Sequence, residues 1–151
     1  MAKKSVSCRE KLEKGERKVV DDPKGRGKML IPKPLDIDGL VRKIAKGKLL
    51  TDSRIRERLA VDFHADLTCP LCTGIFLRIV AEAAEEDLSR GVAEIAPYWR
   101  VLKADGSLNV KFPGGAEAQA ARLIEEGHRI EPGKGKKPPK VTDFMKALQT
   151  L

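Results

Sequence analysis

The chain has 151 residues, of which 41% are hydrophobic, and a formal net charge of +8. This length and composition predict one globular domain with extensions, and the lack of any run of about 18 apolar residues excludes a membrane-spanning helix. The N-terminus has no apolar stretch typical of a secretory signal, and an odd number of cysteines argues against a disulfide framework. We therefore expect a cytoplasmic protein without membrane attachment.

The positive charge is concentrated in the N-terminal third. Residues 1–48 carry 15 Lys and Arg against 7 Asp and Glu, whereas residues 49–151 carry 15 of each kind. A cationic segment on a neutral body is typical of proteins that bind a polyanion, and nucleic acid is the expected partner. The alternative is a solubilising tail.

Residues 1–34 are expected to form a basic, weakly structured arm. Glycines and prolines interrupt the Lys and Arg runs, and little periodic apolar pattern appears. The segment 29–32, Met-Leu-Ile-Pro, is the exception and is expected to dock on the body as a short extended segment. The folded domain is expected to begin near Leu35.

Three helices are predicted next, over about residues 36–46, 52–59 and 69–87. Thr51 and Thr68 are the expected N-caps of the second and third helices, because their side-chain oxygens can accept from free backbone N–H groups. The apolar side chains of the third helix are expected to share one buried side: Leu71, Ile75, Ile79, Val80 and Ala83.

The remainder of the chain is rich in turns. A turn is predicted at residues 104–107, a fourth helix at 116–126, a basic Pro/Gly/Lys loop at 132–140, and a last short helix at 143–148 capped by Thr142. Two short helices, a long helix and a turn-linked extended region predict a mainly α fold with a small β wing, a winged helix-turn-helix. That domain is expected to span residues 35–131, with residues 132–151 as a basic loop and short C-terminal helix.

The segment Pro97-Tyr98-Trp99-Arg100-Val101 contains the only Tyr and the only Trp of a chain with 4% aromatic residues. Two adjacent aromatic rings between a Pro and an Arg indicate a site. The alternative is a short strand with one ring buried and its neighbour half exposed.

Four segments, in order, resemble the DNA-binding domain of the methylated-DNA–protein cysteine methyltransferases, which repair alkylated guanine. Residues 46–55 resemble the family's G-x-V-x-T-Y-g-x-I at the first helix of its helix-turn-helix, and residues 97–101 resemble its active-site P-C-H-R-V. Residues 104–106 resemble the short turn that follows, and residues 123–129 resemble the L-L-x-x-E-G-H-R that closes the family domain. The resemblance covers about residues 36–131 and implies the fold of the alkyltransferase C-terminal domain, a winged helix-turn-helix.

The chain departs from the family at the residues that carry out the transfer. In the family the Cys accepts the alkyl group and the His, with water, acts as its base, whereas Tyr98 and Trp99 stand at these positions here. A phenol with a pKa of about 10 and no neighbouring base is a poor nucleophile at neutral pH. The resemblance therefore implies a protein similar to the alkyltransferase-like proteins, which replace the Cys and bind lesions without repairing them. The candidate residues of the former alkyl pocket are Pro97, Tyr98, Trp99, Arg100 and Glu126, of which the last matches the Glu that orients the family's His.

The resemblance also assigns candidate DNA contacts to the second and third helices. Asp52 stands where the family has its base-flipping Tyr, and the family's recognition-helix Arg has no clear counterpart, although Thr73 or Cys72 falls near its position. In the family the third helix enters the minor groove, and Gly74 would allow such an approach or, alternatively, close packing of helices. The candidate DNA-binding residues are Thr51, Asp52, Ser53, Arg54, Thr73, Gly74 and Arg78. Arg56, Arg58 and the N-terminal lysines would add phosphate contacts, or else form an ordinary solvated face.

The cysteines offer a rival chemistry. Cys69 and Cys72 form a C-x-x-C at a helix N-terminus, where the helix dipole lowers the pKa of a thiol, and His64 precedes them by five residues. A zinc site or a redox pair would use these three residues, but no second pair of ligands completes a set of four. The alternative is a structural pair of small core residues.

We therefore expect a monomeric, non-catalytic protein that binds double-stranded DNA without a cofactor, and the finer hypothesis is a sensor of alkylated guanine in DNA repair. The missing counterparts of the flipping Tyr and the recognition-helix Arg count against that finer hypothesis. If the former pocket is filled, DNA binding should be largely non-specific; if it is open, a flipped base could stack on the rings. The alternatives are a domain recruited to protein interaction through the aromatic pair, or an enzyme that depends on Cys69 or Cys72.

Overall fold

The computed structural model describes residues 8–151, which fold as a mixed α/β protein. Within these residues the α-helices are α1 (Cys8–Glu13), α2 (Pro34–Val41), α3 (Asp52–Asp62), α4 (Pro70–Ser89) and α5 (Gly115–Glu125). The strands are β1 (Lys18–Asp21), β2 (Lys28–Ile31), β3 (Leu50–Thr51), β4 (Leu67–Thr68), β5 (Val101–Leu102), β6 (Ile130–Glu131) and β7 (Lys140–Val141), and two short 3-10 helices are η1 (Tyr98–Arg100) and η2 (Phe144–Ala147). Among the described helices, none is both long enough and apolar enough to cross a bilayer.

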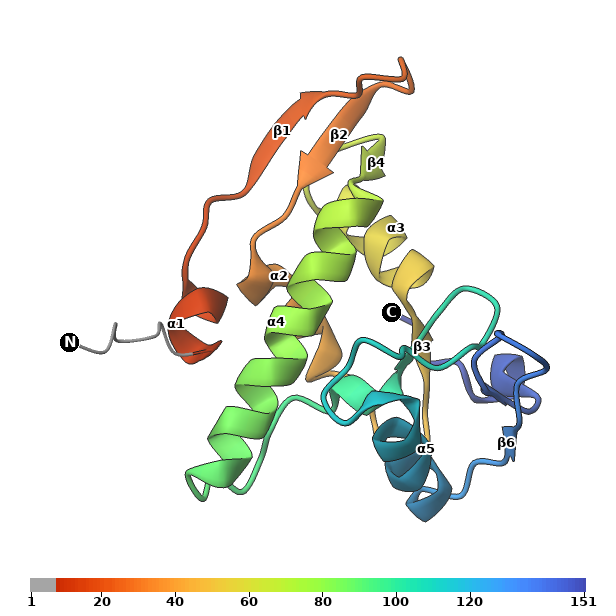
Figure 1. Ribbon diagram of the computed structural model, residues 1–151. Coiled ribbons are helices and arrows are strands. Elements are labelled where there is room, and N and C mark those ends of the chain that lie inside the picture. Colours follow the sequence, from red (N-terminus) through yellow and green to blue (C-terminus); the bar gives the residue numbers. More distant parts are fainter. Residues whose placement is uncertain (1–7) are drawn as a thin grey trace.

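The long helix α4 lies at the centre of the main core, with α1, α2 and α3 packed against it (Figure 1). Apolar side chains at helical spacing supply this core because each helix turns one stripe of its surface inward. Ile37 of α2, Ile55 of α3 and Val80 of α4 are fully buried there. This packing leaves the opposite face of α4 uncovered.

The prediction of a weakly structured arm is wrong for most of residues 8–34, and residues 1–7 lie outside the described part of the chain. The short extended segment expected at 29–32 is confirmed, because it coincides with β2 (Lys28–Ile31), which docks on β4. The strands β1 and β2 form an antiparallel hairpin, and β2 also pairs in parallel with β4. Leu12 of α1 and Leu30 of β2 are buried in the main core. The partner strand β4 follows β2 by more than 30 residues, and the apolar segments of this region are only three or four residues long. These features explain why no period was visible in the sequence.

The helix caps agree with the sequence at one of three positions. Thr51 caps α3 as predicted, because its hydroxyl accepts a hydrogen bond from the backbone N–H of Arg54. Thr68 is paired in β4 instead, and Cys69 occupies the N-cap of α4, where its sulfur accepts from the N–H of Cys72. Thr142 does not cap the last helix, which is the 3-10 turn η2 and has no side-chain cap.

A second, smaller core joins the C-terminal residues to the rest of the protein. It contains Leu49, Leu102, Leu108, Leu123 and Val141, all nearly inaccessible to solvent. Strand β3 pairs in parallel with β5, and β6 pairs in antiparallel with β7. Residues 132–151 are therefore packed into the fold, and the predicted loop over 132–140 connects β6 to β7. Trp99 contacts both cores.

Candidate functional site

The aromatic segment forms a turn of 3-10 helix, η1, and not the short strand considered as an alternative. Pro97 precedes this turn, and Val101 continues directly into β5. Strand β5 pairs with β3, which leads into α3, and η1 contacts both α4 and α5. The two aromatic residues are therefore held between α4 and α5, near the start of α3. The five candidate pocket residues are thus brought to one place.

Tyr98 is part of the protein interior, with only 3% of its surface exposed. Its hydroxyl donates a hydrogen bond to Glu85 Oε1 at 2.6 Å, and its ring meets those of Trp99 and Phe112 edge-on, with centroids 5.5 and 5.2 Å away. Burial and the hydrogen bond to Glu85 both raise the pKa of the Tyr98 phenol. The Tyr98 phenol is therefore neutral, and its ring is part of the packed interior.

Trp99 and Arg100 both bind the carboxylate of Glu126. The Trp99 Nε1–H donates to Oε2 at 3.1 Å, and Arg100 forms an ion pair with the same oxygen at 2.7 Å. Arg100 also donates to the carbonyl of Ile44, so its guanidinium is fixed from two sides. Burial opposes ionisation of Glu126, but the hydrogen bonds from Arg100 and Trp99 outweigh it and lower the pKa of the carboxyl group.

Arg122 of α5 closes the network. Its guanidinium carbon lies 4.4 Å from the centroid of a Trp99 ring, and its Nη2 pairs with Glu85 Oε1 at 2.7 Å. Glu85 thus accepts from both Tyr98 and Arg122, while Glu126 accepts from both Trp99 and Arg100. Both carboxylates are satisfied in this network, although Arg122 Nη1 is buried without a hydrogen-bond partner in the described residues. The space around Tyr98 is filled, whereas Pro97, Trp99 and Arg100 line an open depression of about 480 Å³.

The second candidate region is the pair of helices α3 and α4, joined by residues 63–69, which the sequence predicted as a helix-turn-helix. Two of its predicted DNA contacts are structural residues, and the prediction is wrong for them. Thr51 is 3% exposed and caps α3, while Thr73 is 1% exposed and its hydroxyl donates to the carbonyl of Cys69 at 2.8 Å. Asp52 and Ser53 are half-buried in the first turn of α3, and Arg54 is exposed beside them.

The outer face of α4 carries an exposed stripe that the sequence analysis placed partly in the core. Leu71 is 73% exposed and Ile75 is 51% exposed, so the prediction that both are buried is wrong. They share this face with Gly74 and Arg78, at the i, i+3, i+4 and i+7 spacing of one helix surface. A Cβ added to Gly74 would meet nothing within 4 Å, which favours open space over tight helix packing there. Only Ile79, Val80 and Ala83 of the five predicted positions face the core.

The C-x-x-C is not arranged as an activated site. Burial raises the pKa of the Cys72 thiol to about 11, aided by its hydrogen bond with Cys69, and this shift is opposite to the one expected from the helix dipole. His64 is exposed, with a left-handed backbone. Among residues 8–151 no three His, Cys, Asp or Glu side chains form a group that could hold a metal ion, so His64 does not join the two cysteines in one.

Comparisons of the chain with protein-family models, with curated proteins and with solved structures found no match. The family resemblance therefore stands on its four sequence motifs. Glu85, Phe112 and Arg122 were not predicted as site residues. They complete the aromatic network from α4, the loop before α5 and α5 itself. The scarcity of aromatic residues was the one available signal for Phe112. No local signal exists for the other two, because their partners are distant in sequence.

Proposed function

We propose that this protein is a non-catalytic DNA-binding protein whose helix-turn-helix, α3 and α4, docks on double-stranded DNA without selecting an alkylated base. The supporting observation is the stripe of α4 defined by Leu71, Gly74, Ile75 and Arg78. It is exposed, small at its centre and uncovered by any element of residues 8–151. A helix face of this kind can approach a groove closely, and sugar and phosphate contacts then position it without reading sequence.

Positive charge flanks the proposed contact face on the N-terminal side of α4. The β1–β2 hairpin lies beside the start of α4, because β2 pairs with β4 and β4 leads directly into the helix (Figure 1). Lys18 and Lys24 of this hairpin are exposed and form no ion pair within the described residues. Arg54 of α3 is also exposed and forms no ion pair within the described residues. Such cations can neutralise phosphates, which supports duplex binding that weakens steeply with salt.

The aromatic network supports the absence of transfer chemistry. A nucleophile at the former Cys position would need to be ionised and accessible, whereas the Tyr98 phenol is buried with a raised pKa. Phe112, itself 3% exposed, packs edge-on against the Tyr98 ring and helps to close the space around it. The burial of Tyr98 therefore favours equal affinity for plain and alkylated duplexes over lesion sensing.

Gly74→Glu is expected to weaken binding to a short duplex at least about 10-fold, because it places a carboxylate on the face that meets the phosphates. The fold should tolerate the change, since the position is exposed and open in the second turn of α4, and Gly costs about 0.5–1 kcal/mol relative to better helix formers. Trp99 is the only Trp, so we would first try its emission as the signal, with fluorescence anisotropy of a labelled duplex as the independent measurement.

Gly39→Glu is the matched control. Gly39 is also an exposed glycine inside a helix, α2, and a Cβ there also meets nothing within 4 Å. Gly39→Glu should leave the affinity for the duplex within about 2-fold of the unmodified protein. Both variants add one negative charge, so a difference between their affinities reports the position of that charge. Equal losses in both variants would contradict docking by α4. If the unmodified protein does not bind plain duplex at low salt, the DNA proposal itself is wrong and the exposed apolar stripe would point to a protein partner.

A further inference from the structure

The loop between β6 and β7, residues 132–139, is held in one position against the turn at 103–107. The backbone N–H of Leu108 donates to the carbonyl of Pro139 at 2.9 Å, and that of Val141 donates to the carbonyl of Gly106 at 3.0 Å. Gly133 lies so close to the carbonyl of Lys137 that any side chain at this position would collide with it. The loop is therefore fixed at its base and across its width, which is unusual for a segment of such polar composition.

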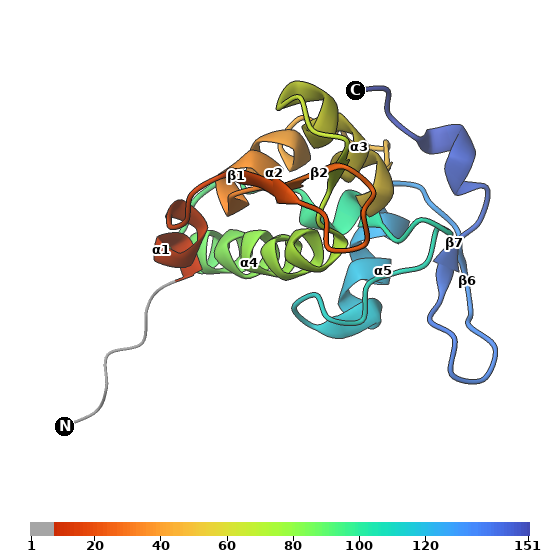
Figure 2. The same ribbon diagram turned by 90° about the horizontal axis from the view of Figure 1, so that it is seen from above.

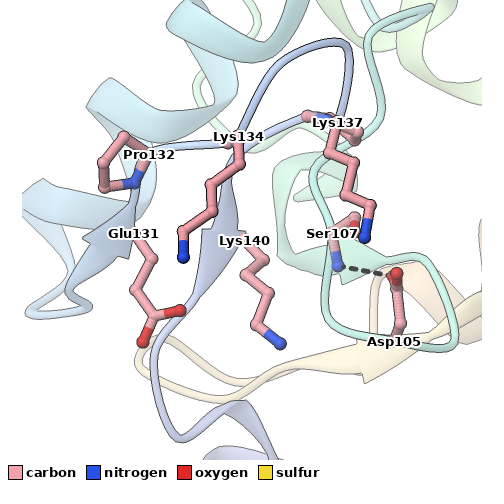
Figure 3. Close-up of a pocket in the computed structure, with 9 residues that line it drawn as sticks. Asp105, Ser107, Glu131, Pro132, Lys134, Lys137 and Lys140 are labelled. Atoms are coloured by element: carbon pink, nitrogen blue, oxygen red, sulfur yellow. Dashed lines mark hydrogen bonds between the residues drawn. The ribbon is translucent and has the colours of Figure 1, made fainter.

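A pocket of about 430 Å³ lies between this loop and the turn, and it is lined by Lys134, Lys137 and Lys140. Figure 3 shows Lys137 extending toward Ser107 and Asp105, Lys134 extending toward Glu131, and Lys140 between them. The two acidic residues at the pocket are Asp105 and Glu131. Three ammonium groups thus share one concave surface with two carboxylates.

The lysines of this pocket form no direct ion pair. None of the three bridges to a carboxylate of residues 8–151, although many of the arginines do. Asp105 is instead occupied by Ser107, whose backbone N–H donates to Oδ1 at 3.0 Å. Lys140 lies close enough to Asp105 to help lower the pKa of that carboxyl group, after the hydrogen bonds from Ser107. Residues 129–140 hold five Lys and Arg and one acidic residue, so the loop is a local centre of positive charge.

We propose that this pocket binds backbone phosphates of duplex DNA, beyond the footprint of the helix-turn-helix; this inference rests on the proposed function. Ammonium groups bind phosphate as compact point charges, and three of them on a fixed loop lose little freedom on binding. Seen from above, α5 lies between α4 and the β6–β7 hairpin (Figure 2). The surface that connects the hairpin to the helix pair is therefore the one beside α3.

A second depression connects the lysine pocket to the helix-turn-helix. It is lined by Asp52 and Arg56 of α3 together with Lys103, and it shares Asp105, Ser107 and Pro138 with the lysine pocket. The path from α3 to the loop is thus a continuous surface with a cation at each stage. A phosphate backbone following this path would reach the three lysines last.

The test removes the three charges together and measures the salt dependence of binding. In the variant Lys134→Gln, Lys137→Gln, Lys140→Gln, the slope of log Kobs against log salt for a plain duplex of about 20 base pairs should become shallower by at least about 1, with affinity at least about 10-fold weaker at about 0.1 M salt. All three side chains are exposed, so the fold should persist, which an unchanged thermal midpoint would establish.

The control carries the same charge change on another loop: Lys43→Gln, Lys46→Gln, Lys48→Gln. These residues are exposed, and their loop is bound to Gln149 near the C-terminus, away from the lysine pocket. Equal slopes for both triple variants would overturn the proposal while leaving the helix-turn-helix as the DNA site. No duplex binding by the unmodified protein would overturn the proposed function as well.

Free inorganic phosphate is the other source of the same chemistry. It would be titrated into the protein while the backbone amide signals of Gly106 and Ser107 are followed by NMR. Saturable shifts that the lysine variant lacks, together with unchanged salt slopes for DNA, would assign the pocket to free phosphate and overturn the backbone proposal. Weak shifts with a shallower DNA slope would support it.

Discussion

Glu126→Gln is expected to lower the free energy of unfolding by about 3 kcal/mol, measured by urea titration followed by far-UV circular dichroism. The Arg100–Glu126 ion pair is nearly closed to water, with side-chain exposures of 13% and 8%. Gln keeps the shape and can still accept from the Trp99 indole, but it removes the charge that balances Arg100. An unpaired guanidinium then remains buried in the network, and that is the costly outcome when one partner of a buried pair is removed.

Glu82→Gln is the matched control, because Glu82 also pairs with an arginine, Arg78. That pair lies four residues apart on the exposed side of α4, with side-chain exposures of 60% for Arg78 and 32% for Glu82. Its loss should cost below about 0.5 kcal/mol. If both variants cost the same small amount, the Trp99–Arg100–Glu126 network contributes no more than a surface pair, and its assignment as the organising contact of the aromatic site is wrong.

The difference in stability between the unmodified protein and Glu126→Gln should shrink in acid. The folded-state pKa of Glu126 is below its ordinary value, so the carboxylate contributes stability that is fully present above the unfolded pKa and lost as pH falls through the folded pKa. Repeating the urea titrations between about pH 7 and pH 3 should show the difference narrowing below about pH 5. A difference that stays constant, or widens on acidification, would contradict the charge-based explanation.

The aromatic site could be located from the sequence but not completed. A lone Tyr and a lone Trp next to Arg100, with Glu126 carried over from the family motif, identified four members of the network. The roles of these residues depended on partners that no spacing indicates. Glu85 is 13 residues from Tyr98 in sequence, and Arg122 is 23 residues from Trp99; they meet because η1 lies between α4 and α5. Tertiary packing, and not local pattern, decides that Tyr98 is a core residue.

The sequence also did not suffice to predict which face of α4 is buried. The period of α4 was visible, but Leu71 and Ile75 fit a buried stripe as well as an exposed one, because a pattern states which residues share a face and not what covers it. The turn chemistry was more reliable. Thr51 caps α3, and the predicted 104–107 turn is closed by a hydrogen bond from Gly106 N–H to the carbonyl of Lys103. Both features depend on neighbours in sequence, but the caps predicted at Thr68 and Thr142 failed because Thr68 is paired in β4 and the last helix is a 3-10 turn that starts after Asp143.

Leu30→Ala is expected to lower the free energy of unfolding by about 2–5 kcal/mol, the usual cost of removing a fully buried leucine. Leu30 is inaccessible to solvent and lies in the main core, and its carbonyl accepts a hydrogen bond from the N–H of Cys69 at the start of α4. The residue therefore joins the N-terminal hairpin to the helix proposed to dock on DNA. The measurement is again urea unfolding.

Val19→Ala tests the same hairpin from its solvent side. Val19 pairs directly with Leu30 across the β1–β2 ladder but is 46% exposed, so its truncation should cost below about 1 kcal/mol. A small effect for both variants would mean that the basic N-terminal segment is a loosely attached tail after all. A large effect for Leu30→Ala alone would mean that the lysines of the N-terminal segment are carried on a rigid hairpin. A rigid hairpin loses less conformational freedom than a tail when it binds a phosphate backbone.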